Sequence, residues 1–419
     1  MTSIHTLRLA GFVLAGFLSG TAGAAGSASP PPPAHSPEAA SAPHGQASTG
    51  TTEPAPAIAI TVSNPLAQPR ARETISVALS EVLRMVPGFD VKKAQIVDAT
   101  DKEILSQLVD MDGDESPDEL VFQTDLGAKE TKTFKLKAGQ RHLAARDDYK
   151  VYGRFVRERH DDFAWENDLV AHRVYGPDLE TCAKEPLTSS GVDTWVKRVS
   201  KLVVNDWYMT DNYHQDVGDG ADFYAVGKSR GCGGLGVWAG GKLHVSTNFT
   251  YSRVLANGPI RLVFELTYAP WDAGGTQVAE TRRVILDAGT QFNRVESTFT
   301  GQKGALAVGV GIAKHPGSAV KMDARGGSMR VWEPLDSGKA GNLGTAIVLP
   351  ASPRLEEHHT DLEYLSVTHV PASGRLVYYA GSAWDRAGRI RDAAAWATEV
   401  QSLASRWAAP VKVSLRIDQ

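Results

Sequence analysis

The sequence predicts a mainly β protein in which a small N-terminal β-sandwich precedes a large sandwich domain with one short C-terminal helix. Three observations lead to this fold class. Short runs of alternating apolar and polar residues, such as ETISVALSEV and DELVFQTDL, are separated by Pro, Gly and Asp. Longer runs of the same kind, such as IRLVFELTYAPW, follow in the second part of the chain. Only one stretch near the end repeats its apolar residues at helical spacing.

The N-terminal segment lacks such strands. Residues 1–24 combine a weakly basic start, an apolar run and small residues before Ala24, which predicts a secretory signal peptide. Residues 25–57 are rich in Pro, Ala and Ser and almost devoid of large apolar side chains, so we expect a disordered tether. The protein is therefore expected to be periplasmic or secreted, in a bacterium.

The rest of the chain divides into the two predicted sandwiches. Residues 58–140 hold the short strands, and residues 141–419 hold the long strands and the candidate site. Trp396 and Val400 belong to the helical repeat, which predicts a helix over residues 390–406 and a last strand after it.

Charge and hydropathy narrow the range of partners. The formal net charge of -4 disfavours nucleic acid, whose phosphates require a basic surface. The apolar run of the signal peptide is shorter than the roughly 20 residues that span a bilayer, and no later stretch approaches that length. We therefore expect no membrane span, and the sequence does not indicate the oligomeric state.

Two cysteines, Cys182 and Cys232, lie in the exported part of the chain. In an oxidising compartment they are expected to form a disulfide that fastens the glycine-rich stretch after Asp211. A free, reactive thiol is the weaker interpretation.

The loop VDMDGDESPDEL spaces four aspartates as a calcium-binding loop does. Its departures from the helix-loop-helix pattern are Glu115 in place of Gly and Val121 in place of Glu. The alternative is an acidic hairpin whose aspartates only cap a turn. We expect no required cofactor and consider a structural calcium ion at these residues: Asp110, Asp112, Asp114 and Asp118.

The segment RHDDFAWENDLVAHRVYGP concentrates polar side chains among aromatic ones, which is typical of sugar-binding sites. Read as one strand, it places Glu166 and His172 on one face and Asn167 and Arg173 on the other. A solvated strand edge is the alternative. The substrate-binding candidates of this segment are Trp165, Asn167, His172, Arg173 and Tyr175, and Glu166 is a catalytic candidate.

The stretch DNYHQDVGDGADFYAVGKSRGCGG places Tyr213 and His214 among aspartates and glycines. A histidine titrates near neutral pH and a tyrosine donates a proton to a leaving oxygen, so this pair predicts a base and an acid. Asp222 is a third catalytic candidate, because a hydrolase would pair Glu166 with Asp222 or Glu265. The alternative is a flexible loop between two strands.

Three isolated residues complete the candidates for substrate binding. Arg261 and Glu265 lie four positions apart on a predicted strand and therefore on one face, where a cross-strand ion pair is the alternative. His315 ends an apolar strand, where loops present ligands.

Several long motifs resemble one bacterial exported family, domain of unknown function 4861. They are WENDLVAHRVYGP, GVDTWVKR, YHQDVGDGADFYAVGKSRGCGG, VLANGPIRLVFELTYAPW and LDAGTQFNRVESTF. The resemblance implies a setting in the degradation of pectin and other uronate-containing glycans. The sheet-rich body also resembles the galactose-mutarotase type of β-supersandwich, an analogy that does not fix function.

Three functions are compatible with these observations. The first is a lyase or hydrolase of uronate-containing oligosaccharides, with His214 as base, Tyr213 as acid, and Asn167, Arg173 and Arg261 near the substrate carboxylate. The second is a mutarotase-like sugar epimerase that uses His214 and Glu265. The third is a non-catalytic glycan-binding protein whose aromatic rings stack on sugars.

Overall fold

The computed structural model describes residues 56–210, 212–349 and 355–418. The predicted signal peptide, and the predicted tether up to residue 55, lie outside these residues. The chain is mainly β, as predicted, with three α-helices among the described residues.

The small sandwich is built from two antiparallel sheets. One has the order β26 (Lys412–Ile417), β1 (Ile58–Ser63), β7 (Thr131–Ala138), β3 (Ala94–Val97) and β4 (Glu103–Ile104). The other has the order β2 (Arg70–Ala78), β6 (Glu119–Leu126) and β5 (Ser106–Val109). Apolar side chains of β1 and β2 form the core between the sheets together with Phe122 and Phe134; those of the two strands are Ile58, Ile60, Val62, Ile75 and Val77.

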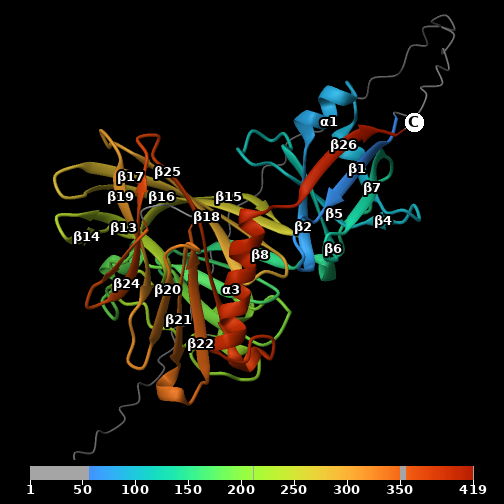
Figure 1. Cartoon of the computed structure of the whole chain (residues 1–419). Coiled ribbons are helices and arrows are strands. Elements are labelled where there is room, and N and C mark those ends of the chain that lie inside the picture. The colour runs from blue at the N-terminus through green and yellow to red at the C-terminus, as the bar shows by residue number, and fades with distance from the viewer. Residues whose placement is uncertain (1–55, 211, 350–354, 419) are drawn as a thin grey trace, which may run out of the picture. The chain divides into compact units, whose positions relative to one another are not determined.

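Two features of this sandwich were not predicted. The end of ETISVALSEV, expected to be strand, forms helix α1 (Leu79–Met85), with Leu79 and Val82 buried. In addition β26 pairs with β1 along its whole length, from Ile58 opposite Ile417 to Ser63 opposite Lys412. Figure 1 shows this strand leaving the end of the C-terminal helix to lie beside β1. The predicted boundary at residues 140 and 141 assigned it to the large sandwich.

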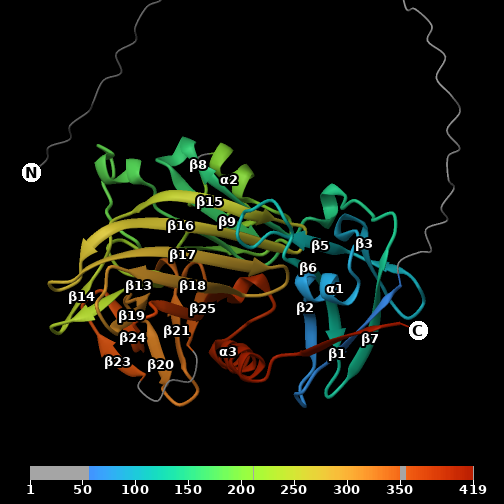
Figure 2. The same ribbon diagram turned by 90° about the horizontal axis from the view of Figure 1, so that it is seen from above.

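One side of the large sandwich is an antiparallel sheet of eight strands. Its order is β15 (Phe249–Asn257), β16 (Arg261–Asp272), β17 (Gln277–Asp287), β18 (Phe292–Thr300), β25 (Arg375–Trp384), β22 (Asn342–Val348), β21 (Ser328–Pro334) and β20 (Ala319–Asp323). Figure 2 shows β15 to β18 running side by side.

Two five-stranded sheets contribute to the same core. The first has the order β12 (Gly220–Ala221), β11 (Asp193–Lys197), β10 (Ala171–Val174), β9 (Asp162–Asn167) and β8 (Val151–Val156). The second has the order β14 (Lys242–His244), β13 (Cys232–Ala239), β19 (Leu306–Ala313), β24 (Glu363–Val370) and β23 (Glu356–His359). Side chains from all three sheets, including Phe163, Phe264 and Val308, form one continuous buried cluster. This arrangement is the predicted supersandwich.

Helices cover the outer faces of this supersandwich. Helix α2 (Val204–Thr210) packs Trp207 and Tyr208 on the outer face of β9 to β11. Helix α3 (Ala393–Ala408) begins at Asp392, whose carboxylate accepts the backbone N–H groups of Ala394 and Ala395. It buries Trp396 against the sheet, and Figure 1 shows the helix lying beside β21 and β22. Its observed start is three residues after the predicted one. Among the described residues, no helix has the length and apolar character needed to cross a membrane.

Candidate functional site

A buried arginine, Arg173, organises a group of carboxylates on the outer face of the sheet β8 to β12. Its guanidinium Nε donates to Asp193 Oδ2 at 2.8 Å, and Nη2 donates to Asp222 Oδ2 at 2.9 Å. A third carboxylate, Asp162, places Oδ2 3.7 Å from Nη1 of the same group. The strand register explains this grouping, because Arg173 on β10 lies directly opposite Asp193 on β11. We call these four residues, with Arg159 and Tyr213, the Arg173 cluster.

Tyr213 is the aromatic member of the Arg173 cluster. Its phenol oxygen accepts hydrogen bonds from Arg159 Nε at 2.8 Å and from Arg173 Nη1 at 3.1 Å. Its ring stacks on Trp195, with centroids 5.3 Å apart and planes inclined by 27°. The Arg173 guanidinium also lies 5.6 Å from the Trp195 ring, a cation–π distance. Two guanidinium groups therefore fix the position of one buried phenol oxygen.

Burial shifts the carboxylates of the cluster toward their protonated forms. It raises the pKa of Asp162 to about 7, although the Arg173 charge opposes the rise. It also raises the pKa of Asp193, again against Arg173. Burial and the neighbouring Asp193 charge together raise the pKa of Asp222. Three carboxylates around Arg173 thus retain protons to a higher pH than aspartates in water, and the cluster can store or release a proton near neutrality.

The cluster reaches solvent at His214 and Arg159. The His214 side chain is 61% exposed, and its Nδ1 lies 3.5 Å from Asp222 Oδ2 and 3.3 Å from the Asp222 carbonyl oxygen. Its ring centroid lies 4.5 Å from that of Tyr213. Arg159 is partly exposed and also donates to Glu185 at 3.2 Å. The predicted base and acid are therefore adjacent, with the base on the solvent side.

The backbone next to Arg159 adopts a strained conformation. His160 and Asp161 have φ angles of 50° and 61°, in the left-handed region that non-glycine residues rarely occupy. Gly176 permits this path, because any Cβ there would overlap the Asp161 carbonyl group. Residues held in such conformations often cluster at functional sites, which agrees with a functional role for the Arg173 cluster.

His315 holds the segment that follows Asp222. Its Nδ1 lies 2.8 Å from Glu333 Oε2 and its Nε2 lies 2.7 Å from the Ala225 carbonyl oxygen. Burial lowers the pKa of His315, but the hydrogen bond and charge of Glu333 outweigh burial, and the net shift is upward. Both ring nitrogens are occupied by protein acceptors. This corrects the predicted substrate-binding role, because His315 positions the loop instead.

Glu166 is also placed differently from its prediction as a catalytic residue. Its carboxylate is fully buried and accepts hydrogen bonds from Lys197 Nζ at 2.7 Å and from the backbone N–H groups of Val203 and Val204. These contacts satisfy both oxygens and anchor the start of α2. Glu166 therefore has a structural role, and no oxygen remains for a substrate.

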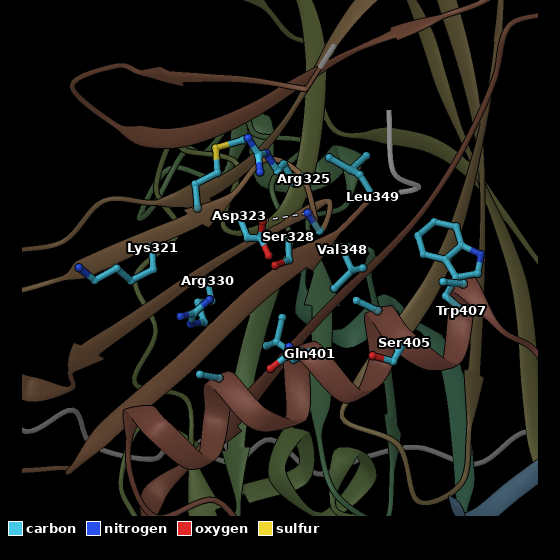
Figure 3. A pocket seen from close by; sticks show the side chains of 16 residues that line it. Lys321, Asp323, Arg325, Ser328, Arg330, Val348, Leu349, Gln401, Ser405 and Trp407 are labelled. Atoms are coloured by element: carbon cyan, nitrogen blue, oxygen red, sulfur yellow. Dashed lines mark hydrogen bonds between the residues drawn. The ribbon is translucent and has the colours of Figure 1, made fainter. Parts of the chain in front are cut away.

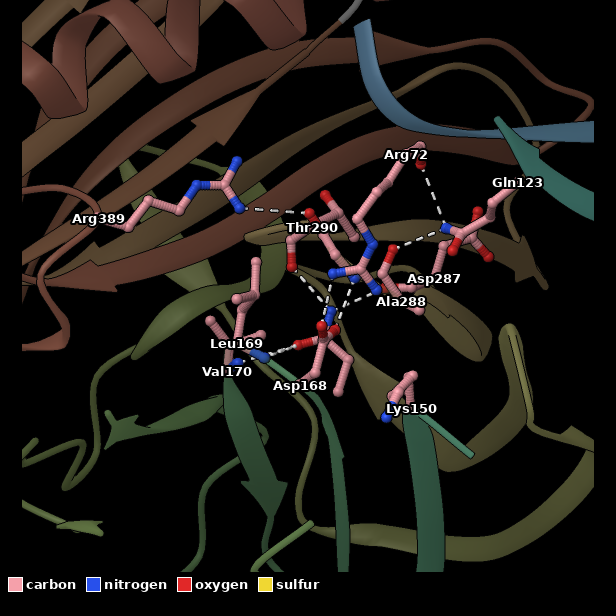
Figure 4. A network of polar contacts seen from close by, with 12 residues as sticks. Arg72, Gln123, Lys150, Asp168, Leu169, Val170, Asp287, Ala288, Thr290 and Arg389 are labelled. Atoms are coloured by element: carbon pink, nitrogen blue, oxygen red, sulfur yellow. Dashed lines mark hydrogen bonds and ion pairs between the residues drawn. The ribbon is translucent and has the colours of Figure 1, made fainter. Parts of the chain in front are cut away.

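Asn167 belongs to a turn, which corrects its predicted contact with substrate. Its Nδ2 donates to the carbonyl oxygens of Asp287 and Thr290, and its Oδ1 accepts the N–H groups of Leu169 and Val170. Figure 4 shows the surrounding network, in which Asp168 is held by Arg72 at 2.6 Å and by a backbone N–H. The segment is thus two strands joined by a tight turn, and the single strand of the prediction is wrong.

The predicted aromatic and histidine contacts to a sugar lie in the interior. Trp165 is buried and its Nε1 donates to Asn293. His172 stacks on Trp165, and complete burial lowers its pKa to about 4, so it is neutral. Tyr175 is buried in a second apolar cluster. All three therefore pack the core, which corrects their predicted roles in binding.

Arg261 and Glu265 form ion pairs, as the alternative interpretation expected. Arg261 bonds both oxygens of Asp287 at 2.7 and 2.9 Å and also bonds Glu119 of the small sandwich. Glu265 accepts from Arg253 and Arg283 on the neighbouring strands. These ion pairs correct the predicted substrate-binding roles of Arg261 and Glu265, since the charge of each side chain already has protein partners.

The acidic loop retains part of its predicted geometry. Asp110, Asp112 and Asp118 each bring one ligand atom within 4.8 Å of the others, and Asp114 is outside this group. The Asp110 carboxylate also accepts three backbone N–H groups of the loop. Calcium requires six to eight oxygen ligands, so backbone or water oxygens would have to complete a site. Calcium binding stays a prediction.

The predicted disulfide is absent, because Cys182 and Cys232 are both free thiols. Cys182 Sγ lies 3.4 Å from His160 Nε2, whereas Cys232 Sγ donates to the Gly381 carbonyl oxygen at 3.3 Å. Burial raises the pKa of the Cys232 thiol, which keeps it protonated. The glycine-rich stretch is instead held by His315 and by the Arg173 cluster.

Four of the predicted site residues, Tyr213, His214, Asp222 and Arg173, lie together in the structure, whereas several of their partners were not predicted. The missed residues are Arg159, Asp162, Asp193 and Trp195. One signal was available, since GVDTWVKR places a lone acid, Asp193, at the start of an apolar run. The pairing of β10 with β11 that makes this acid a partner of Arg173 is a long-range feature.

Fold and site together define a β-supersandwich protein with a buried arginine–carboxylate cluster that reaches the surface at a histidine, His214, and an arginine, Arg159. The chain belongs to the family described as domain of unknown function (DUF4861), whose model matches residues 62–413. "Uncharacterized protein P7" of Formosa agariphila is 34% identical over 374 residues, which cover 85% of this chain and 93% of that protein.

Two solved structures from Enterococcus faecalis also show a likeness. An alpha-mannosidase has a TM-score of 0.44 at 10% identity, and a protein of glycosyl hydrolase family 38 has a TM-score of 0.46 at 11% identity. Each match covers 86% of this chain, which spans less than half of either structure, 46% and 47%.

Proposed function

We propose that this protein is a carbohydrate-active enzyme that cleaves uronate-containing oligosaccharides by β-elimination at the Tyr213–His214 pair. One observation carries the proposal. A phenol oxygen held by two guanidinium groups lies beside an exposed imidazole, with the two ring centroids 4.5 Å apart. Two groups this close can act on neighbouring carbons of one sugar ring.

The roles follow from the chemistry of the two groups and from the contacts that hold them. His214 takes the proton from the carbon next to the uronate carboxylate, and the electron pair left behind forms the new carbon–carbon double bond. The bond to the glycosidic oxygen on the adjacent carbon then breaks, and Tyr213 donates its proton to that oxygen. Arg159, partly exposed beside the phenol, offsets the negative charge of the substrate carboxylate as it grows.

The buried members of the cluster position this pair. Asp222 lies against His214 and is itself bonded to Arg173, so it fixes the imidazole ring. Arg173 is surrounded by protein carboxylates and cannot neutralise a substrate charge as predicted. Hydrolysis by two carboxylates is less well supported, because Glu166 and Glu265 are both held in protein ion pairs.

The sequence supports the compartment and the substrate class of this proposal. The features of residues 1–24 support action in the periplasm or outside the cell, and the motifs shared with the family support a uronate-rich, pectin-like substrate. The chemistry requires no cofactor. Calcium at the acidic loop would be structural.

The test is incubation of the purified protein with pectic and other uronate oligosaccharides, followed by product mass and ultraviolet absorbance. A product with a conjugated double bond and no added water is expected. Tyr213→Phe should reduce kcat/KM by at least about a hundredfold, the scale of general acid catalysis. Tyr208→Phe is the matched control, because its buried hydroxyl has no partner among the described residues. Products that contain added water, or no products, would refute the elimination.

A further inference from the structure

A cleft on the opposite outer face of the supersandwich has the composition of a second binding site. It has a volume of about 660 Å³ and lies between α3 and the β20–β21 hairpin. Figure 3 shows Lys321, Arg325 and Arg330 on the hairpin side, and Gln401 and Trp407 on the helix side. This volume is within the range of roughly 300 to 1,000 Å³ usual for small-molecule sites.

The charges of this cleft are unbalanced. Lys321, Arg325 and Arg330 form no ion pair within the described part of the chain, and Asp323 is the one acid among the lining residues. Lys321 and Arg330 are also direct partners in the register of β20 and β21. Like charges directly opposite each other destabilise a sheet. An anion bound between these side chains would remove that repulsion.

The remaining lining fits a sugar better than a simple ion. The Trp407 indole provides an aromatic face, and Gln401, Ser405 and Ser328 provide amide and hydroxyl groups. Val348 and Val400 form an apolar floor. Aromatic, polar and cationic groups in one cleft match the ring face, hydroxyls and carboxylates of an acidic sugar.

The cleft is separate from the Arg173 cluster. Beneath the cleft, Met329 on β21 and Ile347 on β22 point into the central core. Phe163 on β9 packs into the same core from the other side. The outer faces carry α3 over β22 and α2 over β9 to β11. The core therefore lies between the two sites.

We infer that this cleft binds a stretch of an acidic oligosaccharide away from the site of cleavage. The choice of sugar acids rests on the proposed function, whereas the preference for an anion rests on the cleft alone. Such a site would hold a long substrate chain, or its product, on the protein while the Tyr213 pair acts elsewhere.

The experiment is calorimetric titration with trigalacturonate in a Tyr213→Phe background, so that the probe is not cleaved. The Lys321→Gln/Arg330→Gln variant should weaken binding by at least about tenfold, the scale of hydrogen bonds to charged groups. Lys242→Gln, an exposed lysine on β14 without an ion pair among the described residues, should leave binding unchanged. Melting temperatures confirm that each variant is folded.

Each result is decisive. Unchanged affinity in the double variant overturns the inference, and so does displacement of trigalacturonate by equimolar sulfate, which would indicate a simple anion site. A tenfold loss in the double variant supports it even when the wild-type protein shows no turnover, in which case only the proposed function fails. Turnover together with unchanged affinity leaves the proposed function standing and removes the second site.

Discussion

The Nη1 atom of Arg173 lies 3.1 Å from the hydroxyl oxygen of Tyr213, and the same guanidinium group binds Asp193 and Asp222. A single buried cation thus connects a candidate proton donor to two carboxylates. Burial raises the pKa of both carboxylates. Protonation of the cluster and the position of the phenol are therefore coupled.

Removal of the Tyr213 hydroxyl should affect stability as well as activity. Tyr213→Phe leaves two guanidinium groups without one acceptor each, and an unsatisfied buried donor costs about 1–3 kcal/mol in the free energy of unfolding. Tyr208→Phe should be neutral, because its hydroxyl has no partner among the described residues. Denaturant unfolding of the two variants measures the difference, and equal stabilities would contradict the two hydrogen bonds to the Tyr213 hydroxyl oxygen.

Stability should fall as the pH rises from about 4 to 7. Burial raises the pKa of Asp162 from 3.8 to about 7, so in this window the folded state keeps a proton that the unfolded state has lost. Asp162 therefore lowers the free energy of unfolding progressively up to pH 7, by on the order of a few kcal/mol. Asp162→Asn retains an acceptor for the Gly176 N–H and should flatten this slope. Melting curves across this pH range test it, and a slope unchanged in the variant would refute the assignment.

The Lys197–Glu166 pair should matter for folding and not for chemistry. Both side chains are fully buried and 2.7 Å apart, and removal of one partner from such a pair costs about 3–5 kcal/mol. Lys197→Met should lower the stability by this amount, and the Glu166→Gln/Lys197→Met double variant should recover part of it. Activity per folded molecule, measured well below the melting temperature, should stay at the wild-type level. Loss of activity in the folded double variant would return Glu166 to the catalytic candidates.

Thiol labelling should find two free cysteines in protein prepared without reductant. Cys182 is partly exposed and should react with an alkylating agent in the native state, whereas Cys232 is buried and should react only after unfolding. Intact mass after labelling in denaturant distinguishes two added groups from none. No added groups would establish the disulfide that the sequence predicts.

The sequence predicts the composition of the site better than its geometry. Tyr213, His214 and Asp222 are close in the chain, so the loop that joins them could be recognised from their spacing. His172 and Arg173 were assigned to the wrong faces relative to Glu166 and Asn167, because a turn at Asp168 was read as continuous strand. A change of strand at that point moves every later side chain to the other face of the sheet.

Long-range contacts account for the rest. The carboxylate opposite Arg173 is fixed by the register of β10 and β11, and the partners of Arg261 come from two sandwiches. No local periodicity encodes either contact. The mainly β class and the C-terminal helix, in contrast, follow from patterns within short windows, and both are confirmed.

The pairing of β26 with β1 makes the small sandwich depend on a strand that lies about 350 residues later in the chain. These strands join residues 58–63 to residues 412–417, so the edge of this sheet is incomplete until residues 412–417 have been synthesised. Contacts this distant in sequence form slowly, because a long loop must close first. Without β26, β1 would still pair with β7, but its other edge would present unpaired backbone N–H and C=O groups, which are a template for aggregation.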